Sequence, residues 1–174
     1  MENSAEVPAG QRAGRDRKGK PQKGTDKQRG ELVEMRFMLK AAGLGFGVAK
    51  PWGDSERYDF ALDTGKSFVR VQVKSTYVSR RQSYAVNAKA SQNMAYTTEQ
   101  IDFLVAYIVV EDAWYVVPIG AFAPRKMLKL YPSACKQKNR GFYEQYREAW
   151  DLMKETADDR ALTNSRVLGN LLRR

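Results

Sequence analysis

The spacing of apolar residues predicts a helix that begins after Thr25. Thr25 with Gln28 three residues later has the form of a capping box, and Gly43 is a typical residue at a helix end. On a helical wheel, six residues share a broad apolar face that we expect to pack on the rest of the protein: Leu32, Met35, Met38, Leu39, Ala41 and Ala42. Glu34 lies on the same predicted buried side, where a carboxylate needs a partner such as Lys74 or a metal ion. The alternative role is that of an acid near the helix start, favoured by the helix dipole.

Alternation of apolar and polar residues predicts two strands after this helix. The first, residues 58–62, turns Asp59 to the side opposite its aromatic residues, and the second, residues 69–74, turns Gln72 and Lys74 to the side opposite its valines. If a short glycine-containing turn joins them as neighbours, the polar sides coincide and Asp59 faces Gln72 and Lys74. An ammonium without compensation is costly in a half-buried sheet, so we expect this side to open into a cleft.

The rest of the pattern predicts further strands and one more helix. Short apolar runs predict strands at residues 46–49, 84–88 and 126–131, and two longer runs predict a buried hairpin at residues 101–119. Aromatic and apolar residues that recur at helical spacing predict a second helix whose stripe packs on the sheet: Phe142, Tyr146, Ala149, Trp150 and Met153.

The chain has the length of one ordinary domain. Of its 174 residues, 43% are hydrophobic, which suits a globular protein with its own core. Residues 1–24 are rich in Gly, Lys, Arg and Gln without apolar periodicity, which predicts a disordered basic arm. We therefore expect a domain at residues 25–156, followed at residues 157–174 by a tail or docking helix.

Composition narrows the possible chemistry. The chain has no histidine and a single cysteine, which excludes His/Cys zinc sites, Ser-His-Asp and Cys-His machinery, and nucleases with a histidine base. Any metal must be held by oxygen ligands. The formal charge of +10 favours a polyanionic partner, although a basic protein without a nucleic-acid role fits the charge equally well. No apolar run approaches the roughly 18 residues of a membrane span, so we expect a cytoplasmic protein with no membrane partner.

The polar residues of the two strands suit metal-dependent hydrolysis of a phosphodiester. This chemistry needs hard oxygen ligands for Mg²⁺ or Mn²⁺, a positioned water, and a positive group near the developing charge. Asp59 would bind the metal directly, with Glu34 acting directly or through water. The backbone carbonyl of Val73 and the side-chain oxygen of Gln72 could complete the ligand set. Lys74 would orient or help deprotonate the attacking water and stabilise charge on the phosphorus.

These residues carry a family resemblance. The segments Gly30-Glu31-Leu32-Val33-Glu34, Pro51-Trp52-Gly53-Asp54, Tyr58-Asp59 and Val71-Gln72-Val73-Lys74-Ser75 resemble the PD-(D/E)XK nucleases, and most of all the branch with group I intron-associated homing endonucleases. The resemblance extends from about residue 29 to residue 150. It implies an α/β (α+β) fold with a central mixed β-sheet flanked by helices, the restriction-endonuclease-like core. It also implies catalytic and metal-binding roles for Glu34, Asp59, Gln72 and Lys74.

The sequence departs from the usual family motif at Gln72. An acidic residue is usual two positions before the lysine, although the intron-associated members also have glutamine there. A neutral amide keeps a ligand oxygen but contributes no charge, so metal affinity should depend more heavily on Asp59 and Glu34. Turn chemistry or capping is the simpler interpretation of three other acids: Asp54, Asp63 and Asp102.

The leading hypothesis is a magnesium-dependent DNA endonuclease, with a site-specific homing endonuclease as its most specific form. Because one active site cuts one strand, cleavage of double-stranded DNA would need a homo-oligomer, a dimer or a tetramer. The alternatives are a nuclease selective for DNA junctions or other structures, and an inactive nucleic-acid-binding module in which Gln72 marks lost activity. Five polar residues in connecting segments have suitable side chains for DNA contact, although a solvated loop has the same composition: Arg80, Arg81, Lys89, Gln92 and Asn93.

Overall fold

The structure is a computed structural model that describes residues 25–53, 55–132 and 141–155. The predicted basic arm at residues 1–24, the predicted tail at residues 157–174, and Asp54 lie outside the described residues. Within the described part of the chain, no helix is long and apolar enough to cross a membrane.

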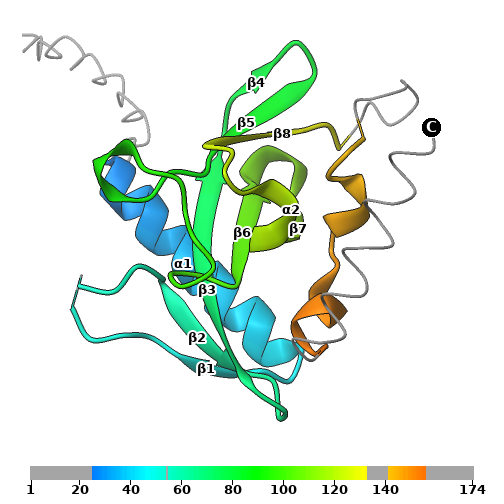
Figure 1. Ribbon diagram of the computed structural model, residues 1–174. Coiled ribbons are helices and arrows are strands. Elements are labelled where there is room, and N and C mark those ends of the chain that lie inside the picture. Colours follow the sequence, from blue (N-terminus) through cyan, green and yellow to red (C-terminus); the bar gives the residue numbers. More distant parts are fainter. Residues whose placement is uncertain (1–24, 54, 133–140, 156–174) are drawn as a thin grey trace, which may run out of the picture.

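A five-stranded mixed sheet forms the centre of the fold (Figure 1). Its strand order is β1-β2-β3-β6-β7, in which β3 and β6 run parallel and the other neighbours run antiparallel. The bounds of these strands are β1 Gly47–Ala49, β2 Phe60–Asp63, β3 Phe68–Thr76, β6 Phe103–Ile108 and β7 Ala113–Pro118. A second sheet has the order β4-β5-β8, with bounds β4 Ser79–Arg80, β5 Ser83–Asn87 and β8 Met127–Leu130. The predicted central mixed sheet is thus confirmed.

Helices and short helical turns cover the two faces of the large sheet. Helix α1 (Asp26–Gly43) and the 3-10 turn η4 (Trp150–Met153) share one hydrophobic cluster with it. The small sheet, helix α2 (Ile119–Phe122) and the turn η3 (Glu144–Tyr146) share the cluster on the other face. Two further 3-10 turns lie in connections, η1 (Ser91–Asn93) and η2 (Val109–Glu111). Both faces of the central sheet are therefore covered, as expected for strands with long apolar runs.

Helix α1 begins with the predicted capping box and ends as predicted at Gly43. The Gln28 N–H donates to the Thr25 hydroxyl at 3.2 Å, and the Thr25 N–H donates to the Gln28 side chain at 2.9 Å. These two bonds satisfy backbone N–H groups that a helix start leaves without partners, so the local sequence determines where α1 begins.

The predicted buried face of α1 was wrong except at Ala41, which is buried as expected. The helix packs on the sheet through Val33, Phe37 and Ala41, which recur at intervals of four residues, whereas Leu39 is 76% exposed and Leu32 58% exposed. Apolar residues cover more than half of the wheel, so periodicity alone does not select one side. The aromatic partners of Phe37 make the selection, because its ring contacts the rings of Phe60, Trp114 and Trp150.

The predicted second helix was also wrong, although its aromatic stripe is buried. The segment forms the separate turns η3 and η4, and Glu148 between them has a φ of 50°. The Glu148 N–H donates to the Trp114 carbonyl at 2.8 Å, and the Trp114 N–H donates to the Glu148 carboxylate at 3.0 Å. These contacts with β7 replace the helical hydrogen bonds that residue 148 would otherwise make, and they bring Tyr146 and Trp150 into the core.

The packing of α1 predicts opposite results for two substitutions on one helix. Phe37→Ala removes a fully buried ring and should lower the free energy of unfolding by about 3–5 kcal/mol. Leu39→Ala alters an exposed side chain and should change it by less than about 0.5 kcal/mol. Urea denaturation followed by circular dichroism measures both, and similar losses for the two variants would contradict this orientation of α1.

Candidate active site

The pairing of β2 with β3 places Asp59 against Gln72 and Val73. Phe60 pairs with Val71 in the antiparallel register, and the Asp59 N–H donates to the Val71 carbonyl at 2.9 Å. The Asp59 carboxylate then accepts two hydrogen bonds at the same oxygen, Oδ2: one from the Val73 N–H at 2.8 Å and one from the Gln72 side-chain amide. The strands thus meet as the alternation of polar residues predicts, and the carboxylate is held from two sides.

Gln72 is a buried polar side chain, only 6% exposed. Its amide nitrogen donates to Asp59 Oδ2 and lies 3.5 Å from the Val73 carbonyl oxygen. The sequence predicts that the Gln72 oxygen binds a metal, whereas here the amide nitrogen is the atom that faces Asp59. Rotation of the amide group exchanges its oxygen and nitrogen, so the same residue has the atoms for either role.

Glu34 lies on α1, and its partner is Lys50 rather than Lys74. The Lys50 ammonium donates to Glu34 Oε2 at 2.6 Å, and this hydrogen bond is the main reason that the pKa of Lys50 is raised. Lys50 directly follows β1, whose antiparallel register with β2 pairs Ala49 with Ala61. Continuation of that register places Lys50 beside Phe60, and its ammonium lies 5.7 Å from the centre of the Phe60 ring.

Burial and charge act in opposite directions on the Asp59 carboxyl group. Burial raises its pKa above the ordinary value and has the largest effect, while the Val73 N–H and the Lys74 ammonium lower it. The negative charge of Glu34 raises it further. Asp59 therefore carries a costly negative charge near that of Glu34 and beside a lysine, and a bound cation would relieve the repulsion between the two carboxylates.

Lys50, Arg57 and Tyr96 are site residues that were not predicted. Burial and the charge of Asp59 raise the pKa of Tyr96 to about 12, and Arg57 acts on it in the opposite direction. Arg57 also donates a hydrogen bond to the Ser91 hydroxyl, which ties the segment before β2 to the loop before β6. Lys50 could have been found by assuming that β1 pairs with β2. The sequence has no local signal for Arg57 or Tyr96, because their place depends on contacts between distant segments.

The other acids have structural roles. Asp63 accepts a hydrogen bond from the Gly65 N–H at 2.8 Å and so forms the predicted turn. Asp102 was predicted as a cap between helix and strand, but it instead accepts from the Arg70 backbone N–H at 2.8 Å and from the Arg70 guanidinium at 3.1 Å. The same guanidinium donates to the Thr98 carbonyl at 2.8 Å, so this pair fastens the loop before β6 to β3.

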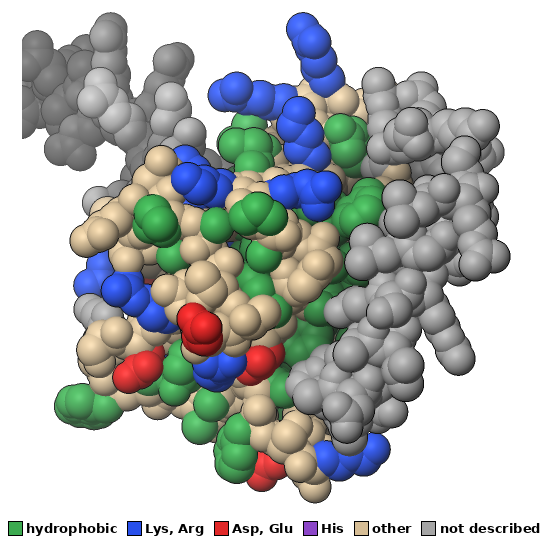
Figure 2. All heavy atoms as spheres, in the orientation of Figure 1, with side chains coloured by type: hydrophobic (Ala, Val, Ile, Leu, Met, Phe, Trp, Pro, Cys, Tyr) green, Lys and Arg blue, Asp and Glu red, His purple; other side chains and the backbone are tan. Residues whose placement is uncertain are grey.

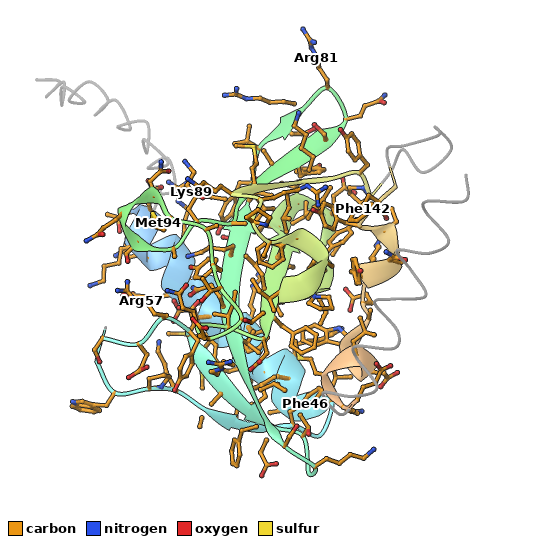
Figure 3. All side chains as sticks on the ribbon, in the orientation of Figure 1. Phe46, Arg57, Arg81, Lys89, Met94 and Phe142 are labelled. Atoms are coloured by element: carbon orange, nitrogen blue, oxygen red, sulfur yellow. The ribbon has the colours of Figure 1, made fainter. Side chains whose placement is uncertain are left out.

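The five candidate DNA-contacting residues lie on two separate elements. Arg80 and Arg81 are at the exposed turn between β4 and β5, and Figure 3 shows Arg81 pointing away from the body of the protein. Lys and Arg side chains gather in this region at the top of Figure 2. Lys89, Gln92 and Asn93 belong to a loop closed by a bridge between Lys89 and Ala95. Arg57 joins that loop to the site through Ser91.

The available donor atoms fit a hard divalent cation. Both hydrogen bonds to Asp59 reach Oδ2, and within the described residues none reaches Oδ1, which is therefore available as a ligand. Among the described residues there is no cluster of three or more His, Cys, Asp or Glu side chains that could hold a metal ion. The carboxylates of Asp59 and Glu34, the amide oxygen of Gln72 and the carbonyl oxygen of Val73 would fill only part of the coordination sphere of a metal ion. Water would occupy the remaining positions, an arrangement typical of Mg²⁺.

The raised pKa of Asp59 predicts that Asp59→Asn stabilises the fold at neutral pH. A carboxyl group whose pKa is higher in the folded state disfavours folding once the pH exceeds its folded pKa, and has no such effect below its unfolded pKa of about 3.9. The amide keeps an acceptor oxygen for the Val73 N–H. We expect Asp59→Asn to have a higher Tm than the parent at pH 7, with the difference shrinking towards pH 3.5. Thermal denaturation measures this, with Asp63→Asn as the exposed control, and a lower Tm at pH 7 would contradict the expectation.

Comparisons with known proteins support the predicted family. A family model described as PD-(D/E)XK endonuclease matches residues 25–153. No curated protein matches the sequence. Among solved structures, the chain is similar to the bacterial homing endonuclease I-Ssp6803I, with 28% identity and a TM-score of 0.67, over 82% of this chain and 99% of that chain. It is also similar to Hjc, a Holliday junction resolvase from Archaeoglobus fulgidus, with 14% identity and a TM-score of 0.44, over 67% and 88% of the two chains.

The family match covers most of the sequence and includes α1 and the strands that bring Asp59 to Gln72. The resemblance carried by the sequence motifs is therefore confirmed, together with the restriction-endonuclease-like fold class. The chain belongs to the PD-(D/E)XK endonuclease family.

Proposed function

We propose that this protein is a DNA endonuclease that uses Mg²⁺, or Mn²⁺ in its place, to hydrolyse phosphodiester bonds. The observation that carries the proposal is the Asp59 carboxylate, half-buried where β2 meets β3 and held by the Val73 N–H and the Gln72 amide. Lys74 follows on the same side of β3 and already acts on the charge of Asp59. A fold does not define a function, but a nuclease fold with these residues at its site supports one.

In the proposed mechanism, each residue acts through its charge or its hydrogen bonds. Asp59 Oδ1 and Glu34 would hold the cation, with oxygen atoms of Gln72 and the Val73 carbonyl as further ligands. When bound, the cation would supply Lewis-acid polarisation of the phosphoryl oxygen. Lys74 places a positive charge near the phosphate, where it stabilises the charge that develops on phosphorus and orients the attacking water.

We further propose that the substrate is double-stranded DNA, which a homo-oligomer cuts at a specific site, as a homing endonuclease does. The formal charge of +10 supports a polyanionic partner, and the basic turn between β4 and β5 provides a surface for phosphate contact. The similarity to I-Ssp6803I, described as a bacterial homing endonuclease, supports the homing type. Two copies would provide one active site for each strand. The proposed place of action is the cytoplasm, at the nucleoid while DNA is bound.

One observation favours an inactive DNA-binding module instead. The Gln72 amide nitrogen donates to Asp59, so its oxygen does not face that carboxylate. Among the described residues, the proposed metal site then has two acidic side chains, Glu34 and Asp59. A module of this kind would bind DNA without cutting it.

A nuclease selective for DNA junctions would use the same residues. Only a comparison of branched and linear DNA substrates therefore distinguishes it from the proposed endonuclease.

Cleavage of supercoiled plasmid in Mg²⁺ tests the activity. We expect the parent protein to nick or linearise plasmids of suitable sequence, and Asp59→Asn and Lys74→Ala to cut at least about 100-fold more slowly. Asp59→Asn removes a charged metal ligand, and Lys74→Ala removes the positive charge near the reacting phosphate. Lys66→Ala is the control, since Lys66 is in the exposed turn between β2 and β3. Intact plasmid across a broad set of sequences, or equal cutting by the site variants, would reject the proposal.

The rates at which the protein cleaves four-way junctions and linear duplexes at equal concentration reveal any preference for DNA structure.

Salt dependence of DNA binding tests the basic turn. In the Asp59→Asn background, which should bind without cutting, we expect Arg80→Ala with Arg81→Ala to weaken binding. The slope of log affinity against log salt should fall by roughly one for each phosphate that the double variant no longer neutralises. Lys154→Ala is a matched control, because Lys154 lies over the Phe46 ring, far from Arg81 in Figure 3. An unchanged slope in the double variant, measured by fluorescence anisotropy, would exclude this turn from the DNA surface.

A further inference from the structure

Lys50 is a second ammonium group within the candidate active site, and its partner is an expected metal ligand. The Lys50 ammonium is 2.6 Å from Glu34 Oε2, where a cation held by that carboxylate would compete with it. Asp59 and Glu31 also raise the pKa of Lys50, so the ammonium interacts with both carboxylates proposed for the metal. The site therefore contains a positive charge that the PD-(D/E)XK motif itself does not include.

Lys50 neutralises one of the two carboxylates proposed for the metal. Glu34 and Asp59 supply two negative charges, Gln72 is neutral, and Lys50 adds a positive charge to those of Lys74 and Arg57. A divalent cation that approaches Glu34 therefore meets a carboxylate whose charge Lys50 has already neutralised. Either the ammonium moves away, or Glu34 binds the metal less tightly than a carboxylate without a partner.

The surroundings of Lys50 allow such a movement. The side chain is 52% exposed, whereas Glu34 is 25% exposed, so the ammonium can reach water while the carboxylate stays in place. The ammonium also lies over the Phe60 ring, and lysine stems commonly pack on apolar surface while the charged end moves. An ion pair this exposed is weak, which keeps its exchange for a metal ion feasible.

We propose that Lys50 is a positioning residue that holds the Glu34 carboxylate until a divalent cation displaces its ammonium, and that it thereby weakens metal binding at this site. The inference rests on the proposed function, because it assumes that Glu34 takes part in metal binding. The competing account is a purely structural tie between α1 and the end of β1. That account predicts a loss of stability without Lys50 and no gain in metal affinity.

Binding of Mn²⁺ without DNA tests the inference. The full-length protein is titrated with Mn²⁺, and free ion is measured by electron paramagnetic resonance. We expect Lys50→Met to bind Mn²⁺ about three- to tenfold more tightly than the parent protein, because a positive charge next to the ligand is removed. Lys50→Arg keeps the charge and should bind within about twofold of the parent.

Lys40→Met is the matched control for Lys50→Met. Lys40 lies on α1, pairs with Glu148 at 3.3 Å, and has its ammonium 5.9 Å from the Trp150 ring centre, an arrangement similar to that of Lys50 but with a partner outside the proposed ligands. Its replacement removes the same charge and should leave Mn²⁺ affinity within about twofold. In a Glu34→Gln background, Lys50→Met should lose most of its effect, because the competed ligand is absent.

Three outcomes overturn the inference. They are unchanged or weaker Mn²⁺ binding by Lys50→Met, an equal gain for Lys40→Met, and absence of Mn²⁺ binding from every variant. Failure of the proposed function is seen separately, as Mn²⁺ binding that depends on Asp59 without cleavage of any DNA. The Tm of each variant, measured in EDTA, shows that the compared proteins are folded.

Discussion

The site depends on a carboxylate that the fold partly buries between two strands. Asp59 stands where β2 begins, and hydrogen bonds from the Val73 N–H and the Gln72 amide hold one of its oxygens. Burial makes its ionised form costly, which is why its pKa is raised. A carboxylate that is costly to ionise and yet is held in one orientation gains most from a cation, so the burial that opposes its ionisation also prepares the site for a metal ion.

The core explains why this contact is rigid. Valines of β3 face α1 and the aromatic rings around Phe37, while Gln72 and Lys74 face the other side of the sheet. The β3 strand also pairs in parallel with β6, and the Arg70–Asp102 pair fastens the loop before β6 to it. The reacting groups therefore lie on a strand that is fixed by both neighbours and by the helix behind it, an arrangement that favours precise positioning.

Much of the site could be predicted because it follows local rules. Strands alternate side chains with a period of two, so Asp59, Gln72 and Lys74 had to share a side once β2 and β3 were neighbours. The start of α1 followed from its capping box in the same way. The buried face of α1 could not be predicted, because apolar residues lie on most of its circumference and only the partner rings select Phe37 over Leu39. The prediction of a second helix was wrong because hydrogen bonds between Glu148 and Trp114 replace the hydrogen bonds that a helix would make.

The sequence by itself determined the chemistry that is possible: no histidine, two carboxylates and a lysine at spacings that a pair of strands brings together, and motifs of one nuclease family. Composition is a property of the whole chain and period-two alternation is a property of residues adjacent in sequence, so both can be determined without knowledge of the fold. Tertiary structure decided the partners. It brought Lys50 rather than Lys74 to Glu34 and placed Tyr96 near Asp59. Such pairs join segments distant in sequence, and their formation depends on the packing of the whole sheet rather than on any local pattern.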